Sequence, residues 1–172
     1  MIITKTSRLL LREIERSDLA ALSKIYADTE FMQFYPGTKS LAEVRTWFQE
    51  LSFNSYLQYG FGLWAVVDQF SGQIMGDCGI TMQETPAGRE PEIGYHLWRD
   101  FWGKGFATEA AMACRCHALF TLGLGRVVSI TSPENIPSQK VAEKVHDRME
   151  VYRKRLQSSM LIVDRYLYIS EI

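Results

Sequence analysis

The sequence predicts an α/β (α+β) fold: a mixed, mostly antiparallel sheet of seven strands with about four helices. Three observations lead to this prediction. Apolar residues recur with helical spacing before about residue 60 and with strand-like alternation after it. Three strand-like stretches then follow one another with connections short enough to be hairpins. Finally, a strand enters a glycine-rich turn that opens a helix, and another strand follows that helix.

Length and composition limit the classes of protein. The 172 residues fit one domain spanning 1–172, and a hydrophobic content of 47% is ordinary for a globular protein. A formal net charge of −1 argues against binding to nucleic acid or to an anionic membrane surface. No apolar run approaches the ~18 residues of a membrane span, and no signal peptide is recognisable. Three cysteines, without CxxC spacing, suit reduced thiols in the cytoplasm.

The first predicted strand and helix lie close to the start of the chain. Residues 8–13, RLLLRE, form a short apolar run between charges and predict a strand. Ser17 and Asp18 are N-cap candidates for a helix that extends to about Asp28. Apolar residues within this helix recur at helical spacing, so one face is expected to be buried.

An aromatic segment, residues 31–37, connects this helix to the next one. Phe31 and Phe34 are expected to plug the core, whereas Tyr35 is a candidate for the wall of a substrate pocket. Ser40 and Glu43 form a capping box that starts a second helix. Gly60 lies in the glycine-containing stretch that ends it.

Strands dominate the second half of the chain. The strand that follows the glycine turn and its helix is joined through that helix, so it is expected to run parallel to the strand before the turn. A proline-containing helix start and a final hairpin complete the order of elements. The predicted strands span residues 62–68, 72–83, 91–98 and 126–132, the last helix opens at 133–138, and the hairpin covers 151–169.

The turn lies within Trp102–Ala111, which reads WGKGFATEAA. Gly103 and Gly105 permit positive φ, and the helix behind them presents unpaired N–H groups and the positive end of its dipole. A phosphate or pyrophosphate suits such a turn. A P-loop would need Ser or Thr after Lys104, and the dinucleotide fingerprint would need Gly or Ala at Thr108. A helix start without any ligand remains the alternative on this stretch alone.

The helix after the turn contains three potential metal ligands. Cys114 and Cys116 are two residues apart, and so do not share a helix face, while His117 follows directly. We therefore interpret them as ordinary helix residues and expect no metal site.

With this turn, the order of elements resembles the GNAT superfamily of acyl-CoA N-acetyltransferases. Of the family's pattern Q/R-x-x-G-x-G/A, the last two anchors match at Gly105 and Ala107, whereas Trp102 replaces Gln or Arg. The variant WGKGFATEA resembles the subgroup of ribosomal-protein-alanine N-acetyltransferases. Three more stretches resemble this subgroup in the same order: TSRLLLRE at 6–13, PEIGYHL at 91–97 and PENIPSQKVAEK at 133–144.

The resemblance implies acetyl-CoA as co-substrate and a sheet splayed between its fourth and fifth strands. Pantetheine would enter the gap and pair with the backbone of His96, Leu97 and Trp98, and Asn135 would contact the cofactor unless it only caps its helix. The pyrophosphate would lie on the turn and the first helical residues, which are Gly103, Lys104, Gly105, Phe106, Ala107 and Thr108.

The implied reaction is attack of an amine on the thioester carbonyl. Strand alternation places Glu92 and His96 on one face, with Tyr95 on the other. The resemblance favours Glu92 as the base, whereas an unperturbed pKa near 6.5 favours His96. The tyrosine that many relatives use to protonate the thiolate is replaced by Ala142, so Ser138 is the candidate for that hydrogen bond.

One departure from the family lies at the end of the last helix. Relatives usually have Gly followed by Phe or Met, where this sequence has His146 and Asp147. If the helix ends as in the family, His146 adopts positive φ, and His146→Gly is expected to stabilise the protein by roughly half a kcal/mol.

The sequence thus predicts a cytoplasmic N-acetyltransferase that transfers the acetyl group of acetyl-CoA to a primary amine by direct attack in a ternary complex. The acceptor is a protein N-terminus or a small amine. A homodimer is one option for its assembly. The absent tyrosine and the His146–Asp147 pair leave open a second function, an acyl-CoA-binding sensor or interaction module without turnover.

Overall fold

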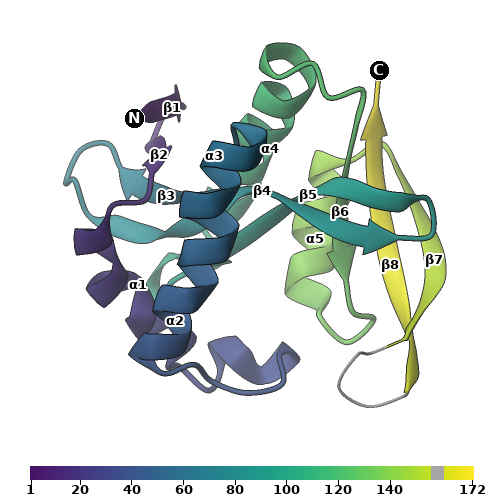
Figure 1. The fold of residues 1–172 in the computed structure, drawn as a ribbon, viewed down its shortest axis with the longest axis horizontal. Helices are drawn as coiled ribbons and strands as arrows, with labels where there is room; N and C mark the ends of the chain where they lie inside the picture. The colour runs from purple at the N-terminus through teal and green to yellow at the C-terminus, as the bar shows by residue number, and fades with distance from the viewer. Residues whose placement is uncertain (156–160) are drawn as a thin grey trace.

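The computed structural model describes residues 1–155 and 161–172. Its strands form one sheet in the order β1-β2-β3-β4-β5-β6-β8-β7 (Figure 1). All neighbouring strands are antiparallel except β5 and β6, which are parallel. The strands are β1 (Ile2–Lys5), β2 (Leu9–Glu13), β3 (Leu63–Asp68), β4 (Ile74–Thr85), β5 (Gly88–Leu97), β6 (Arg126–Thr131), β7 (Arg148–Arg155) and β8 (Ile162–Glu171).

The predicted count of seven strands is one too low for the described residues. The additional strand is β1, which pairs antiparallel with β2 at the edge of the sheet. It has only four residues and none of them is fully buried, so it carries no clear alternation of apolar and polar residues. The final hairpin also begins earlier than predicted, at Arg148 instead of residue 151.

Five α-helices are described. They are α1 (Leu19–Tyr26), α2 (Leu41–Phe48), α3 (Ser55–Tyr59), α4 (Phe106–Cys116) and α5 (Ile136–Val145). A π-helical segment over residues 49–54 joins α2 to α3, so the predicted second helix is one helical region with a wider turn in its middle. The Ser40–Glu43 capping box starts it, and Gly60 ends it in the left-handed conformation with φ of 77°. No helix in the described part of the chain is long and apolar enough to cross a membrane.

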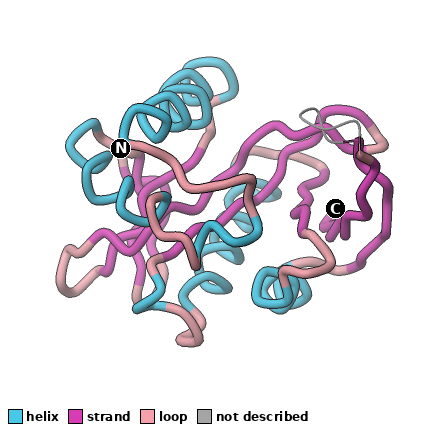
Figure 2. Tube along the Cα trace, turned by 90° about the horizontal axis from the view of Figure 1, so that it is seen from below, coloured by secondary structure: helices cyan, strands magenta, loops and turns pink. Residues whose placement is uncertain are grey.

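Helices lie on both faces of the sheet (Figure 2). On one face, α4 packs through Ala110, Ala111 and Cys114 against apolar residues of the central strands. On the other face, α1 and α2 cover β3. The central strands are therefore buried from both sides, which explains the near-continuous apolar run of β3.

The sheet opens between β5 and β6. The register of this parallel pair consists of Glu92 opposite Val128 alone, whereas β4 and β5 pair along nearly their whole length. Beside that pair, the Ser129 hydroxyl donates a hydrogen bond to the Ile93 carbonyl at 2.8 Å. These contacts mark the apex of the gap, and the predicted splay between the strands at 91–98 and 126–132 is confirmed.

The exit from α5 differs from the expectation. His146 has φ of −109° and ψ of 162°, so the predicted positive φ is wrong, and no strain exists for glycine to relieve. Instead the imidazole is buried and forms hydrogen bonds with the hydroxyls of Ser170 at 3.0 Å and Ser129 at 2.9 Å. Asp147 lies outside and pairs with Arg115 at 2.7 Å. The chain enters β7 directly, because the buried side chain anchors this end of the helix.

Candidate active site

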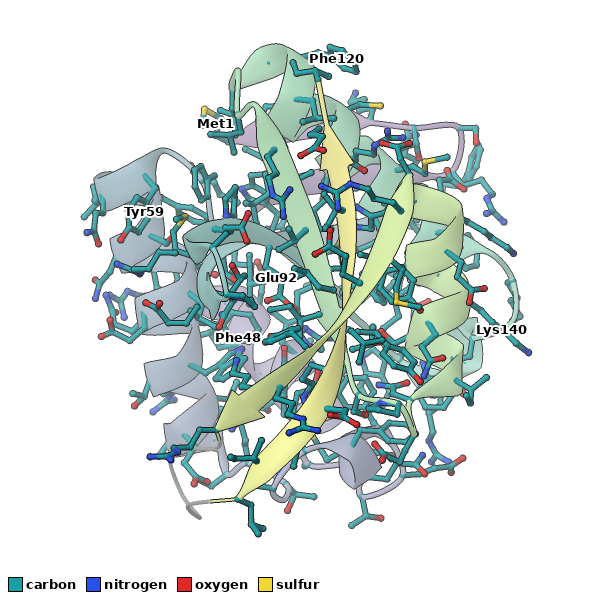
Figure 3. All side chains as sticks on the ribbon, turned by 90° about the vertical axis from the view of Figure 1, so that its right-hand side faces the viewer. Met1, Phe48, Tyr59, Glu92, Phe120 and Lys140 are labelled. Carbon is teal, nitrogen blue, oxygen red and sulfur yellow. The ribbon has the colours of Figure 1, made fainter. Side chains whose placement is uncertain are left out.

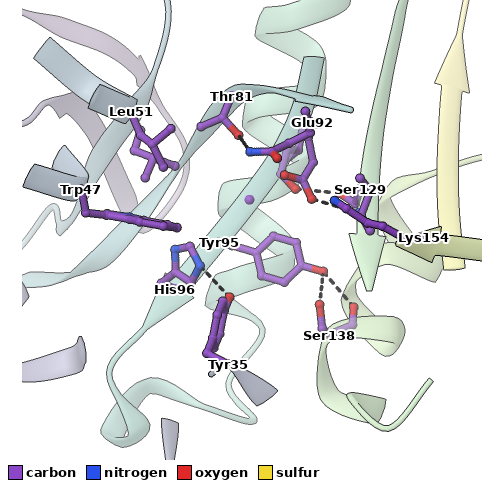
Figure 4. A pocket seen from close by; sticks show the side chains of 15 residues that line it. Tyr35, Trp47, Leu51, Thr81, Glu92, Tyr95, His96, Ser129, Ser138 and Lys154 are labelled. Carbon is purple, nitrogen blue, oxygen red and sulfur yellow. Dashed lines mark hydrogen bonds between the residues drawn. The ribbon is translucent and has the colours of Figure 1, made fainter. Parts of the chain in front are cut away.

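A cavity of about 240 Å³ lies at the apex of the gap (Figure 4). It is bounded by residues from both sides of the opened sheet and from the helical region that covers it. Figure 3 looks onto β7 and β8, with Glu92 on one side of these strands and α5, which carries Lys140, on the other. The polar and aromatic side chains of the cavity wall are Tyr35, Trp47, Thr81, Gln83, Glu92, Tyr95, His96, Ser129, Ser138 and Lys154.

Glu92 lies at the apex itself. Its Oε1 atom accepts a hydrogen bond at 3.2 Å from the backbone N–H of Ile130, a group that the opened strands leave without a β5 partner. Burial raises the pKa of Glu92 to about 7, although the Ile130 hydrogen bond and the charges of Lys154 and His96 act in the opposite direction. A carboxyl group with this pKa exchanges protons near neutral pH.

His96 lies on the same face of β5 and is 8% exposed. Its Nδ1 atom is 2.8 Å from Oδ1 of Asp77 and 3.1 Å from the hydroxyl of Tyr26. On the opposite side of the ring, Nε2 is 2.9 Å from the Tyr35 hydroxyl (Figure 4). Both ring nitrogens therefore have partners. The sequence identified His96 and Tyr35 separately, but it did not identify Asp77 or Tyr26.

Ser138 lies in the first turn of α5, across the gap from β5. Its position is set by Asn135, whose Oδ1 accepts the Ser138 N–H at 3.1 Å as an N-cap. The Tyr95 hydroxyl reaches across, donating to the Ser138 carbonyl at 2.8 Å and lying 3.0 Å from its hydroxyl. The predicted alternation holds, because Ile93 and Leu97 pack on the Tyr95 side in the α4 core. Both faces nevertheless reach the cavity, since β5 has an open edge here.

The glycine turn adopts the predicted conformation. Gly103 and Gly105 have φ of 71° and 82°, values that strain any residue with a Cβ. The Glu109 N–H makes a hydrogen bond to the Gly105 carbonyl at 3.0 Å, so the N–H groups of Phe106, Ala107 and Thr108 precede the regular helical bonding. The turn therefore presents backbone donors in the way that a phosphate requires.

Hydrogen bonds from Arg8 and Thr6, near the start of the chain, hold this turn and Glu109 in place. The Arg8 guanidinium donates to Glu109 Oε2 at 2.7 Å and to the Lys104 carbonyl at 3.0 Å, and it lies 4.1 Å from the centre of the Phe106 ring. Thr6 donates to the other Glu109 oxygen at 2.5 Å. Despite the burial that opposes it, these hydrogen bonds hold the pKa of Glu109 below its ordinary value. Residues 6–8 and Glu109, which lie in two of the stretches that resemble the family, thus contact each other in the fold.

Two side chains of the turn bind the backbone. The Lys104 ammonium donates to the Asp100 carbonyl at 2.7 Å, and the Trp102 indole N–H donates to the Leu97 carbonyl at 2.8 Å. Trp102, which replaces the family's Gln or Arg, thereby ties the turn to the end of β5.

The register of β5 with β4 determines which backbone groups of β5 are free to contact a ligand in the gap. The Trp98 N–H bonds to Met75 in the antiparallel connection to β4, and alternate residues of a strand face opposite edges. His96 and Trp98 therefore direct their backbone groups to β4. Of the three predicted residues, Leu97 turns its N–H to the gap, and Tyr95 joins it there.

The aromatic segment before α2 contributes to the cavity wall. Met32, rather than the flanking phenylalanines, is its fully buried plug, and Phe31 is half-buried beside the Tyr26 and His96 rings. Tyr35 follows in extended conformation, and its hydroxyl is directed to His96.

A glycine turn that presents backbone N–H groups, a sheet opened between parallel strands and acid–base side chains at the opening are the features of acyl-CoA-dependent transferases. The chain belongs to the GNAT acetyltransferase family, since the model of the acetyltransferase (GNAT) domain matches residues 8–146. It is an acetyltransferase, as its relatives also indicate.

Two relatives from Bacillus are similar over most of the chain. The protein YkkB of Bacillus subtilis, strain 168, is 34% identical over 143 residues, which are 81% of each chain. The N-acetyltransferase p20 of Bacillus licheniformis is 30% identical over 167 residues, covering 95% of this chain and 92% of its own.

Solved structures share the whole fold. A GNAT-family acetyltransferase from Bacillus anthracis has a TM-score of 0.81 at 25% identity, covering 99% of this chain and 98% of its own. RimL, a ribosomal L7/L12 alpha-N-protein acetyltransferase in complex with coenzyme A, has a TM-score of 0.79 at 21% identity and covers 100% and 98%. At 21% identity, the similarity to RimL concerns the fold alone.

Proposed function

We propose that the protein transfers the acetyl group of acetyl-CoA to a primary amine by direct attack in a ternary complex. The observation that carries this proposal is the position of Glu92, His96 and Ser138 around one cavity at the apex of the gap. An amine acetylation needs a proton acceptor, an oxyanion donor and a hydrogen bond to the leaving thiolate, and this cavity offers a candidate for each.

The turn and the gap fit acetyl-CoA. The space beside both glycines is open. A Cβ at Gly103 would meet no atom within 4 Å, and one at Gly105 would meet only the end of the Arg8 side chain, so a pyrophosphate could lie there. Gly103 to Thr108 would hold the pyrophosphate, and the Tyr95 and Leu97 backbone would hold pantetheine. Asn135 is used as a helix cap, which supports an indirect role in the site.

Different groups around the cavity would accept the amine proton, stabilise the oxyanion and bind the leaving thiolate. Glu92 or His96 accepts the amine proton, and the Leu97 N–H, at the open edge of β5, is the candidate donor to the oxyanion. Ser138 supplies a hydrogen bond to the thiolate. Burial raises the pKa of Tyr95, so its phenol stays protonated and holds the first turn of α5 through the Ser138 carbonyl. Ser138→Ala is expected to lower kcat and leave the affinity for acetyl-CoA unchanged.

The acceptor is a primary amine, either a protein N-terminus or a small molecule. The RimL structure concerns an alpha-N-protein acetyltransferase, which makes an N-terminal amine one candidate. Aromatic side chains of Trp47 and Tyr35 on the cavity wall suit a compact amine equally well. We also infer that the protein acts in the cytoplasm, where acetyl-CoA is available to it.

A screen for acetyl-CoA-dependent release of CoA tests this function. The probes are an alanine-initiated peptide, a serine-initiated peptide, spermidine, tyramine and an aminoglycoside, each compared with a blank without amine. Release above the blank with one probe supports the proposal. Binding of acetyl-CoA in calorimetry with no release from any probe overturns it, and favours the second function, an acyl-CoA sensor that lacks the thiolate-side tyrosine at Ala142.

A further inference from the structure

A buried carboxylate lies behind His96. Asp77 is in the middle of β4, is 0% exposed, and is directly opposite His96 in the antiparallel register. Its two oxygens have separate partners: Oδ1 lies 2.8 Å from His96 Nδ1, and Oδ2 accepts the Tyr26 hydroxyl at 2.8 Å. A buried carboxylate is costly unless it is paired, so this strand position requires both partners.

The hydrogen bonds define which nitrogen of His96 carries the proton. Tyr26 donates its only proton to Asp77, and burial raises the pKa of Tyr26 well above its ordinary value, so this donor persists. With the Asp77 carboxylate as acceptor, Nδ1 must be the protonated nitrogen of the neutral ring. Nε2 consequently has a free lone pair, and it is this atom that faces Tyr35.

Tyr35 connects this lone pair to the cavity. Its hydroxyl donates to His96 Nε2 at 2.9 Å, and the residue lines the cavity while 37% of it remains exposed. The tyrosine thus stands between the imidazole and the space in which an acceptor amine would lie. Asp77, His96 and Tyr35 form a continuous chain of hydrogen bonds from the core to the cavity wall, in the arrangement by which a buried carboxylate orients an imidazole as a base.

Glu92 has a different set of contacts. One of its oxygens holds the Ile130 N–H at the apex of the gap, so it already stabilises the opened backbone. Its charge acts on His96 through space, and it faces Lys154 of β7 across the cavity. These contacts suit a carboxyl group that holds the opened backbone and, when it is ionised, stabilises an imidazolium beside it.

We propose, building on the acetyl transfer proposed above, that Tyr35 and His96 relay the proton of the acceptor amine, and that Asp77 positions His96 for this task. As the neutral amine nitrogen bonds to the thioester carbonyl carbon, one of its protons passes to the Tyr35 oxygen while the Tyr35 hydroxyl proton passes to His96 Nε2. The C–S bond breaks when the tetrahedral intermediate collapses, and the thiolate leaves with a hydrogen bond from Ser138. The imidazolium lies between Asp77 and Glu92 until its proton returns to solvent.

The relay makes Tyr35 a catalytic residue and Asp77 a positioning residue. The titratable and charged groups that face His96 are Asp77 of β4, Tyr26 of α1, Tyr35 after the aromatic segment and Glu92 of β5, with Lys154 of β7 on the far side of the cavity. A ring whose Nε2 already carries a proton cannot receive the proton of the amine, so turnover is expected to fall at low pH.

The test compares kcat against pH for the wild type, Tyr35→Phe and Asp77→Asn, using acetyl-CoA and whichever probe amine of the screen releases CoA. We expect Tyr35→Phe to lower kcat on the order of 10²-fold and Asp77→Asn by at least as much, with acetyl-CoA affinity unchanged. Asp77→Asn is also expected to displace the acidic limb of the profile. Tyr59→Phe, which removes a hydroxyl from α3 outside the cavity, is the matched control and should match the wild type.

NMR chemical shifts of the imidazole nitrogens supply a readout that folding alone would not move. In the free wild-type protein, Nδ1 should be protonated and Nε2 should accept a hydrogen bond, whereas Asp77→Asn should lose the preference for this tautomer. Because Asp77 is buried, circular dichroism first checks that its variant folds; Tyr35, at the rim, gives the same kinetic test independently.

Two results would overturn the relay alone, and a third would overturn it together with the proposed acetyl transfer. An active wild type whose Tyr35→Phe variant keeps kcat within about threefold, with Glu92→Gln removing the acidic limb, assigns the proton to Glu92 instead. A wild type with Nε2 protonated contradicts the tautomer on which the relay depends. A wild type that binds acetyl-CoA but releases no CoA with any probe is a failure of the proposed acetyl transfer, and the relay falls with it.

Discussion

His96 and His146 are buried to nearly the same degree, but the groups that surround their rings differ in chemistry. His96 is 8% exposed and His146 is 9% exposed, and each has hydrogen-bond partners on both ring nitrogens. His96 has a carboxylate on one nitrogen and a cavity-lining phenol on the other. His146 has two serine hydroxyls, Ser129 and Ser170, and its ring does not line the cavity.

The difference teaches that burial alone does not mark a histidine as catalytic. Ser129 donates its hydroxyl proton to the Ile93 carbonyl, so it accepts from His146 Nε2–H, and Nδ1 accepts from Ser170. Burial, followed by the charge of Arg115, lowers the pKa of His146 to about 4, although Asp147 opposes this change. His146 is therefore a neutral bridge from the end of α5 to the apex of the gap.

The largest expected effect separates the two rings by activity. His96→Gln should lower kcat by 10²–10⁴-fold, the range for loss of an acid–base group, because it removes the nitrogen that receives the proton. His146→Gln should keep kcat within about threefold, provided that the protein is folded. Steady-state rates with a probe amine, alongside circular dichroism, measure both. Equal losses in the two variants would break the comparison.

The next effect separates them by stability. His146→Gly should lower the free energy of unfolding by about 2–4 kcal/mol, since it leaves a cavity and two buried hydroxyls without their partner. This reverses the slight stabilisation expected from the sequence, which assumed positive φ. Denaturant midpoints at constant m-value measure the change. A gain in stability would show that the imidazole bridge contributes nothing.

A smaller effect is expected in the pH dependence of stability. Because the folded pKa of His146, about 4, is below its unfolded value, the unfolded chain binds the proton more readily. The stabilisation is fully present above pH ~6.5 and is lost as the pH falls towards 4, at up to about 1.4 kcal/mol per pH unit. Unfolding free energies of the wild type and His146→Gln between pH 7.5 and 4.5 should converge on the acidic side. A constant difference over this range contradicts the assigned pKa.

The smallest effect concerns one end of the bridge. Ser170→Ala should cost about 1 kcal/mol, because Nδ1 of His146 loses one neutral hydrogen bond while Ser129 still holds the ring. Thermal unfolding against the wild type measures this difference. A cost as large as that of His146→Gly would mean that Ser170 has further contacts that stabilise β8.

Local signals allowed much of the fold and site to be predicted. The glycine turn, the capping box at Ser40 and the hairpins of the central strands each lie within a few residues of sequence, and Glu92, His96 and Ser138 follow from strand alternation and family resemblance. Asp77 has a signal of its own, an acid within the buried GDCG stretch of β4. Its partner, however, depends on the register between β4 and β5, which no short stretch encodes.

Contacts between distant segments account for what was missed. Arg8 and Glu109 are neighbours only because β2 packs beside the start of α4. His146 replaces a glycine of related sequences, and a pattern that reports the loss of glycine cannot report the two serines that compensate for it. These serines lie on β6 and β8, and the sheet order brings them to the end of α5.

The single backbone pair between β5 and β6 has a consequence for how the native protein opens. The polar contacts that join the sheet across this line are the Glu92–Val128 pair, the Ser129–Ile93, Ile130–Glu92 and Tyr95–Ser138 hydrogen bonds, and the Arg126–Glu90 ion pair at 2.5 Å. We therefore expect β6, α5, β7 and β8 to open together in partial unfolding, at a lower free energy than the strands β2–β5. A ligand that lies along the gap would bond to both sides at once, so slowed amide hydrogen exchange in β6 and β8 would report its binding from outside the cavity.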